Sequence, residues 1–418
     1  MGALSVALWL TLAAQTPPSS NPAPTAPAGP ARFRGALELS ALSFPSGTPG
    51  GSQDLFIVAA PSLSFDGGSD FGLELGAPLR LRVFDDPPQQ HSRDHWNVLR
   101  REDWDETSDF GQVLRELRIG AEASPIQLRA GLFSGYTLGH GQLISRYGNQ
   151  VNPNYHPAGA SLVAFLGPTR TELFASDILG GRILAGTFSL DLARTFNRPQ
   201  DTWDRWHAGV DIASDFGRAG GSSPPMTLAW VFLDGVVFRG EQTQVAAHVG
   251  GGGRYDSREP SFGATLGLAL DAQPRGMKWG GRLELRKQNG GFRQGMIGYD
   301  YELARFSAIG LGFMPIAAEV LPDNWSVYGE VSTAIGGGDP EARGVPDVVA
   351  SVAVERYFWG RTHVDVSVSG RALQGKLTGG ARLAITGLGE APRYLAGVEA
   401  RWRFLPSLYA LGQGGTVF

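Results

Sequence analysis

The chain has no cysteine among its 418 residues, so disulfide bonds are excluded. No apolar run reaches the ~18–20 residues that a transmembrane helix needs. Acidic and basic side chains nearly balance, with 40 Asp and Glu against 36 Lys and Arg, and no basic domain points to nucleic acid. These absences argue against a disulfide-stapled domain, a helical membrane protein and a nucleic-acid-binding protein.

Glycine is the residue that the chain has in excess. Its 59 glycines are about twice the ~7% share of an average protein, and they follow no collagen-like period. They accompany stretches in which every second residue is apolar, such as 71–83, 262–270 and 394–404. Period two is typical of a strand with one apolar and one polar face, and glycine suits the bends between strands.

The repeated segments predict an all-β fold. Each runs for roughly 9–12 residues, which matches the ~9–11 residues of a tilted membrane strand better than the ~5–6 of an ordinary strand. We therefore expect a transmembrane antiparallel β-barrel of roughly 16–20 strands, with about 18 as the central value. A soluble sandwich would alternate too, but its core requires large interlocking residues, whereas these apolar faces are rich in small ones.

Aromatic residues near the segment ends favour a membrane-facing surface, because aromatic girdles mark the two interfaces of a transmembrane barrel. The residues expected in such girdles are Phe44, Phe65, Phe71, Phe84, Trp325, Tyr357, Phe358, Trp359, Trp402 and Phe404.

The chain divides into three parts. Residues 1–14 resemble a signal peptide, because an apolar run from Ala3 ends in the small residues Ala13 and Ala14. The alternative is a buried N-terminal helix. Residues 15–32 form a Pro/Ala-rich linker, and residues 33–418 form the barrel.

The expected connections fall into two lengths, like the short periplasmic turns and long external loops of a barrel. Short ones are expected at Ala123–Pro125, Gly167–Pro168, Ala304, Trp359–Arg361, Gln374–Gly375 and Leu405–Pro406. Long ones are expected at Asp85–Phe110, Gly139–Pro157, Pro315–Asp323 and Gly336–Pro346. Between Ser176 and Phe216 the alternation breaks, and no face is assigned there.

The export signal, the serial alternation and the terminal aromatic Phe418 together resemble bacterial outer-membrane β-barrel proteins of the porin type. The resemblance is one of architecture, since no motif marks a particular family. It implies the outer membrane of a Gram-negative bacterium, with outer-membrane lipid, lipopolysaccharide and the barrel-insertion machinery as partners. The chain departs from the usual terminal pattern, because Thr416, Gly414, Gly412 and Ala410 stand where apolar residues alternate in that class.

Charged residues recur on the polar faces and are expected to line a pore. A barrel of ~16–18 strands is wide enough for an aqueous channel, and unpaired charges in a dry interior are costly. The predicted pore-lining residues are Glu74, Arg80, Arg82, Glu116, Arg118, Arg129, Glu172, Asp211, Arg282, Glu284, Arg286, Glu330, Glu355, Asp365, Arg382, Glu399, Arg401 and Arg403. The alternative is a ladder of cross-wall ion pairs that closes the lumen.

No catalytic residue, metal site or cofactor is predicted. His140 and Ser145 share one loop, but they form no recognisable motif. Asp94 and His95 share another loop and form no recognisable catalytic motif there. His91 and His95 are four residues apart, a spacing that would suit a metal only if the loop were helical.

Two loops carry groups that suit a ligand. The loop 85–110 is rich in Asp, Glu and Arg and could bind a cation, fold inward as a constriction, or be solvated. The loop 139–149 combines hydrogen-bonding and stacking groups that suit sugars, with a solvated loop as the alternative.

The sequence thus predicts a non-enzymatic outer-membrane channel for hydrophilic solutes. A glycan is the preferred class, because Arg, Glu, Trp and Tyr suit sugar hydroxyls and ring faces. Polysaccharide and periplasmic export components would then be further partners, with import and export both open. The alternatives are a closed-lumen scaffold barrel of a cell-surface assembly and, less favoured, an outer-membrane hydrolase. Complete pairing of the lumen charges would favour closure, and unpaired charges in water would favour a pore.

Overall fold

The computed structural model describes most of the chain. The described residues are 32–45, 53–84, 99–100, 103–121, 124–150, 155–196, 206–217, 224–256, 261–274, 276–302, 304–305, 315–336, 347–373, 375–390 and 392–415. The expected signal peptide, the linker up to residue 31 and Phe418 lie outside them, so those assignments stay predictions.

Strands make up nearly all of the regular structure. They are β1 (Arg32–Pro45), β2 (Gln53–Asp66), β3 (Phe71–Gly76), β4 (Leu79–Phe84), β5 (Leu114–Ile119), β6 (Ile126–Gly131), β7 (Ser134–Tyr136), β8 (Tyr147–Gly148), β9 (Gly159–Leu166), β10 (Thr169–Ala175), β11 (Ile183–Asp191), β12 (Trp206–Asp215), β13 (Met226–Arg239), β14 (Thr243–Arg254), β15 (Ser261–Ala272), β16 (Met277–Gly290), β17 (Leu321–Ile335), β18 (Val348–Tyr357), β19 (Thr362–Ala372), β20 (Leu377–Leu388), β21 (Arg393–Leu405) and β22 (Leu408–Gly415). The connections carry the short helices η2 (Thr107–Val113), α1 (Leu192–Thr195) and η3 (Ile316–Ala318). Across the described residues, no helix has the length and apolar character needed to span a membrane.

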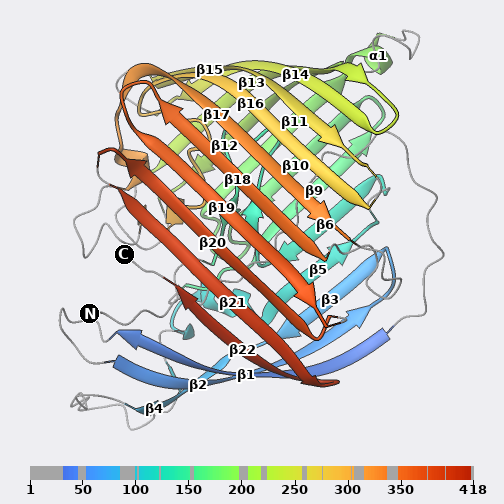
Figure 1. Ribbon diagram of the computed structural model, residues 1–418, viewed down its shortest axis with the longest axis vertical. Helices are drawn as coiled ribbons and strands as arrows, with labels where there is room; N and C mark the ends of the chain where they lie inside the picture. The colour runs from blue at the N-terminus through green and yellow to red at the C-terminus, as the bar shows by residue number, and fades with distance from the viewer. Residues whose placement is uncertain are drawn as a thin grey trace.

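The large sheet closes on itself as a barrel whose strands tilt across the wall (Figure 1). Successive strands pair antiparallel, and β6 pairs with β9 because β7 and β8 form a separate hairpin. β3 and β4 both pair with β2, so they act as one bent strand and the barrel has 19 strands. The predicted all-β barrel of about 18 strands is confirmed. An odd number makes β1 and β22 run parallel where they meet, a feature that the alternation did not reveal.

The alternation decides which residues face the membrane. Along β15, Phe262, Leu266 and Leu268 are 47%, 62% and 50% exposed, whereas Thr265 among them is 4% exposed. The exposed side chains point outward, and the same pattern recurs on the other strands. The result is a continuous apolar outer surface, which suits a lipid bilayer and would be unfavourable in water. This surface confirms that the barrel is a transmembrane one.

Tyr357 departs from the expected aromatic girdle. It lies two residues after Glu355 on β18, so it shares the inner face and is fully buried. Trp325 and Trp402 are exposed on the outer face, as a girdle requires. The assignment of Tyr357 was wrong because a position near the end of a strand says nothing about which face a side chain takes.

The two ends of the barrel differ in their connections. One end carries short turns such as 167–168, 373–376 and 406–407, and the other carries the long loops after β4, β6 and β16. Three expectations are wrong. Ala304 is buried inside the loop after β16, and the long connection between β17 and β18 lies at the short-turn end. The short connection at Trp359–Arg361, between β18 and β19, lies at the end with the long loops.

Two neighbouring residues of β17 test the assignment of faces. Val331 is 54% exposed and faces lipid, whereas Ser332 faces the lumen and is half-buried. We expect Val331→Arg to impair insertion, because an arginine facing lipid costs about 2–4 kcal/mol near the midplane. Ser332→Arg should insert almost normally. The folded fraction after refolding into vesicles, read from heat-modifiable gel mobility, measures both, and equal losses would show that the faces are misassigned.

Candidate functional site

The described part of the connection after β6 folds into the lumen, and we call residues 132–150 and 155–158 the hairpin loop. At its tip Gly139 and Gly141 have φ values of +52° and +77°, a backbone conformation that favours glycine. Just beyond the tip, Leu143 and Ile144 are fully buried. The tip therefore packs inside the barrel, although its sequence is typical of an exposed turn.

The connection after β16 folds inward as well, and we call residues 291–302 and 304–305 the inner loop. Phe292 is fully buried and stacks on Trp230 of the wall, with ring centroids 5.9 Å apart. The two loops meet in the lumen, where the Tyr147 hydroxyl donates to Glu302 Oε1 at 2.5 Å. Apolar packing on the β10–β14 side thus holds both loops in place.

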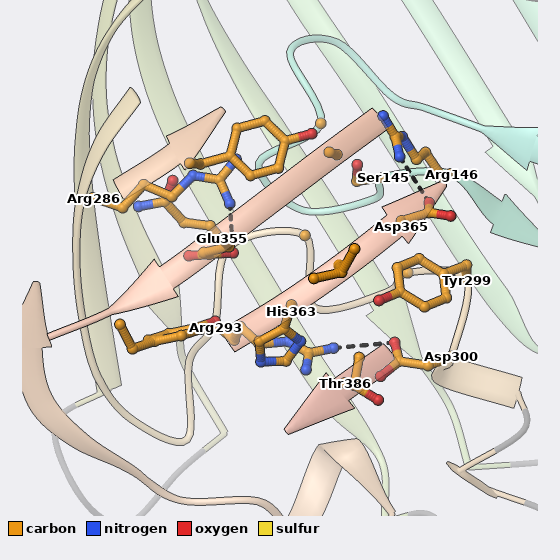
Figure 2. Close-up of a pocket in the computed structure, with 18 residues that line it drawn as sticks. Ser145, Arg146, Arg286, Arg293, Tyr299, Asp300, Glu355, His363, Asp365 and Thr386 are labelled. Carbon is orange, nitrogen blue, oxygen red and sulfur yellow. Dashed lines mark hydrogen bonds and ion pairs between the residues drawn. The ribbon is translucent and has the colours of Figure 1, made fainter. Parts of the chain in front are cut away.

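One guanidinium ties the hairpin loop to the opposite wall. Arg146 donates to Glu330 on β17 at 2.5 Å and to Asp365 on β19 at 2.7 Å; Figure 2 shows the second contact. Its φ of +56° is strained for a residue other than glycine and costs about 1–3 kcal/mol. Glu330 also binds Arg282 at 3.2 Å, and Asp365 also binds Arg382 at 2.8 Å. Each carboxylate would therefore keep a cation without Arg146.

A second network is buried on the inner face of β16 to β18. Arg286 binds Glu284 at 2.6 Å and Glu355 at 2.9 Å, and its side chain is 4% exposed. Glu355 also accepts from Gln288 at 2.8 Å, and Glu284 from His248 at the same distance. Since Arg286 compensates two buried carboxylates, its removal would leave uncompensated charge.

All predicted pore-lining residues lie in strands. Alternation along the strands places most of them on the inner face, and the pairing of Glu116 with Glu74 and of Arg129 with Arg118 places these two residues there as well. The buried ones are Arg80, Glu172, Asp211, Glu284, Arg286, Glu355 and Asp365. The half-buried ones are Glu74, Arg82, Arg118, Arg282, Glu330, Arg382, Glu399, Arg401 and Arg403. Glu116 and Arg129 are exposed. The structure thus divides the predicted pore-lining residues into a buried group and a more accessible group. For both groups a pore-lining role stays a prediction.

Exposure of the inward side chains falls from the short-turn end toward the loop end. On β16, Lys278 is exposed, Arg282 is 16% exposed and Glu284 is fully buried. On β21, Arg401 keeps 37% exposure although it binds Glu38 at 2.9 Å. We call this accessible part of the lumen the vestibule. It lies toward the short-turn end, and the two loops lie toward the other end of the lumen.

The described part of the loop after β4 also packs inward. Asp103 is fully buried and binds Arg80 at 2.9 Å and Arg100 at 2.5 Å. Asp109 is fully buried too and accepts from the backbone N–H of His156 at 3.2 Å. For these residues the solvated alternative is wrong, and the inward fold is what the structure shows.

Glu319, which follows η3, fastens the end of the connection after β16 to the wall. Arg361 donates to its carboxylate at 2.6 Å, and Arg293 lies 3.9 Å from it. Burial by itself would raise the pKa of Glu319, but the two guanidinium groups outweigh burial and lower the pKa below its ordinary value. The carboxylate is therefore ionised at neutral pH and keeps both partners.

Of the residues considered for catalysis, the structure describes His140 and Ser145, and these two form no hydrogen-bonded pair. His140 stacks on His248, with ring centroids 5.5 Å apart, and lies 3.8 Å from Asp234. Among the hydrogen bonds of the described residues, none joins His140 to Ser145, which faces the inner loop instead. His91, Asp94 and His95 lie outside the described residues.

The inner loop is the part of the site that the sequence reasoning missed. Arg293 donates to Asp300 at 3.2 Å within this loop, and Arg305 binds Asp215 on β12. A usable signal was present, because residues 289–301 contain four glycines and show no alternation, as is typical of a loop.

The fold and its inner surface define a class of protein. A closed antiparallel barrel with an apolar outer surface and a polar, partly filled lumen is a transmembrane β-barrel of the outer-membrane type. No family model matches the chain, and no curated protein is similar to it. No particular family is therefore assigned.

The chain is similar to several solved structures at low sequence identity. OccD3 (OpdP) of Pseudomonas aeruginosa is 12% identical with a TM-score of 0.39, over 88% of this chain and 90% of that one. A BenF-like porin from Pseudomonas fluorescens is 9% identical with a TM-score of 0.36, over 87% and 94%. Wzi of Escherichia coli, an outer membrane protein involved in group 1 capsule assembly and a carbohydrate-binding β-barrel, is 10% identical with a TM-score of 0.34, over 92% and 82%.

The buried network predicts unequal effects of removing two inward arginines. Arg286→Ala should destabilise the barrel by about 3–5 kcal/mol, because Glu284 and Glu355 lose a buried partner. Arg403→Ala, in the vestibule, should stay within about 0.5 kcal/mol of the wild type. Urea unfolding in detergent, followed by intrinsic fluorescence, compares the two. A small effect of Arg286→Ala would mean that water, and not protein, solvates these carboxylates.

Proposed function

We propose that this protein is an outer-membrane channel for hydrophilic solutes, narrowed by its own inward loops. The observation that supports the proposal is the vestibule, where accessible charges of both signs lead from the short-turn end to the hairpin loop and the inner loop. A lumen closed for structural reasons alone has no need of charges held in water. Because both signs are present, we expect weak ion selectivity.

A glycan is our proposed solute. Tyr328 and Tyr357 on the lumen wall, and Tyr299 in the inner loop, lie among guanidinium and carboxylate groups. Aromatic rings suit the apolar faces of sugars, and charged groups make strong hydrogen bonds to hydroxyls. Export of polysaccharide, with periplasmic components as partners, is part of the same proposal.

The paired charges beneath the loops favour a second candidate. Arg146 and Arg286 each join two carboxylates, and apolar packing holds the loops on the other side. If the loops never leave these positions, the lumen is closed and the barrel serves as a scaffold in a cell-surface assembly. Movement of the hairpin loop is what separates the two candidates.

Conductance in planar bilayers tests the proposal with the wild type and Arg146→Ala. We expect the wild type to conduct in small steps and Arg146→Ala to conduct in larger ones. The substitution removes two charge-assisted bonds from the hairpin loop, while Glu330 and Asp365 keep Arg282 and Arg382.

Arg403→Ala is the matched control, since it removes an inward arginine that makes no contact with either loop in the described residues. It should leave the step size nearly unchanged. Silence of both the wild type and Arg146→Ala, in bilayers where insertion of the barrel is verified, would contradict the channel and favour the scaffold.

A further inference from the structure

A half-enclosed pocket of about 70 Å³ lies where the two loops meet the wall of β16 to β20 (Figure 2). The inner loop contributes Arg293 and Asp300, β18 contributes Tyr357, and β19 contributes His363. Since a water molecule needs at least ~10–15 Å³ of such space, the pocket is large enough for several waters or for part of a solute.

Four residues that line this pocket each have a buried polar atom with no hydrogen-bond partner among the described residues. The atoms are Arg293 Nη1, Asp300 Oδ2, Tyr357 OH and His363 Nε2. Arg293 Nη1 lies 3.9 Å from Glu319 and Asp300 Oδ2 lies 3.8 Å from Arg393, which is beyond hydrogen-bond distance. Arg293, Asp300 and Tyr357 are 6%, 6% and 0% exposed. Buried polar groups are normally bonded, and leaving one unsatisfied costs about 1–3 kcal/mol. Four such atoms around one cavity mark a place built to receive hydrogen bonds from something else.

The character of these atoms restricts the ligand. Arg293 Nη1 can only donate, Asp300 Oδ2 can only accept, and Tyr357 OH and His363 Nε2 can do either. A ligand that satisfies all four must therefore offer donors and acceptors side by side. Hydroxyl groups do both at once, which favours a polyhydroxylated molecule.

The charge of the lining argues for a neutral ligand. Its three guanidinium groups, those of Arg146, Arg286 and Arg293, are matched by three carboxylates, those of Asp300, Glu355 and Asp365. Each of these charges already has a partner of opposite sign. A charged ligand would lose its hydration without gaining a free counter-charge, which is costly at a buried site.

We propose that this pocket is a binding subsite for a neutral sugar, which inserts the hydroxyl-bearing edge of one ring. The proposal deepens the proposed function, since it names the place in the lumen where a glycan would be held. Arg293, Tyr357, His363 and Asp300 bond the hydroxyls, while the rings of Tyr299 and Tyr328 border the cavity.

Isothermal titration of the refolded full-length protein in detergent tests the subsite. Glucose, galactose and maltose are the neutral probes, with glucuronate and glucosamine as charged analogues. We expect at least one neutral sugar to bind and the charged analogues to bind more weakly. Tyr357→Phe should weaken that binding roughly five- to tenfold, the contribution of about one hydrogen bond. It should not lower stability, because the hydroxyl it removes is unbonded in the free protein.

Tyr136→Phe is the matched control. Its hydroxyl donates to Glu172 at 2.7 Å, and Tyr136 does not line the pocket. We expect this variant to lose stability and to bind sugar as the wild type does. Absence of binding by every neutral sugar, equal binding of the charged analogues, or unchanged affinity in Tyr357→Phe would each overturn the subsite and leave a cavity that holds only water.

The titration and the bilayer recordings separate this proposal from the channel. Sugar binding by a protein that never conducts would uphold the subsite and refute transport. Conductance without sugar binding would uphold the channel and refute the subsite.

Discussion

A bilayer interior offers no hydrogen-bond partner to the backbone, so a protein that crosses it as strands must close its sheet. Everything else in this structure depends on that constraint. The 19 strands pair in sequence around the wall, and the last strand returns to the first. Closure with an odd number makes that final pairing parallel, and among the described residues it comprises three residue pairs, from Leu37 with Leu408 to Leu39 with Ala410. Bacterial barrels usually have an even number of strands, so this short seam sets the chain apart.

Closure at this width creates an interior that must be filled or wetted. The chain does both, in different places. On the β10–β14 side, rings such as Tyr136 and Phe174, stacked with centroids 4.1 Å apart, form a dry core with the loops. On the β16–β19 side, Arg146 fastens the hairpin loop to the wall through ion pairs, and Arg286 joins β16 to β18. Toward the short-turn end the lumen stays accessible. The inner surface is therefore buried and paired near the loops and accessible toward the short-turn end.

The apolar packing and the ion pairs inside the barrel differ in how easily they can be broken. Apolar packing and the Arg286 network are hard to undo, because breaking either leaves a cavity or a buried charge. The Arg146 contacts are easier to release, since both of its carboxylates have other cations and its own backbone is strained. The hairpin loop is thus held more weakly at Arg146 than by its apolar packing, and Arg146 lines the pocket whose buried polar atoms lack hydrogen-bond partners. A loop that moves there would change both the width of the lumen and access to that pocket.

The sequence by itself determined the class of fold and the two faces of the wall. Period two is a local property of an extended backbone, so it placed Leu266 outward and Thr265 inward correctly. It also put Glu284 and Arg401 on the inner face, but it could not tell that the first is sealed and the second is half-exposed. That difference depends on where loops far along the chain return, as when Arg146 reaches Glu330 and Asp365. Only the tertiary structure decides such contacts, because Glu330 and Asp365 lie 184 and 219 residues from Arg146 along the chain and the local pattern carries no trace of them.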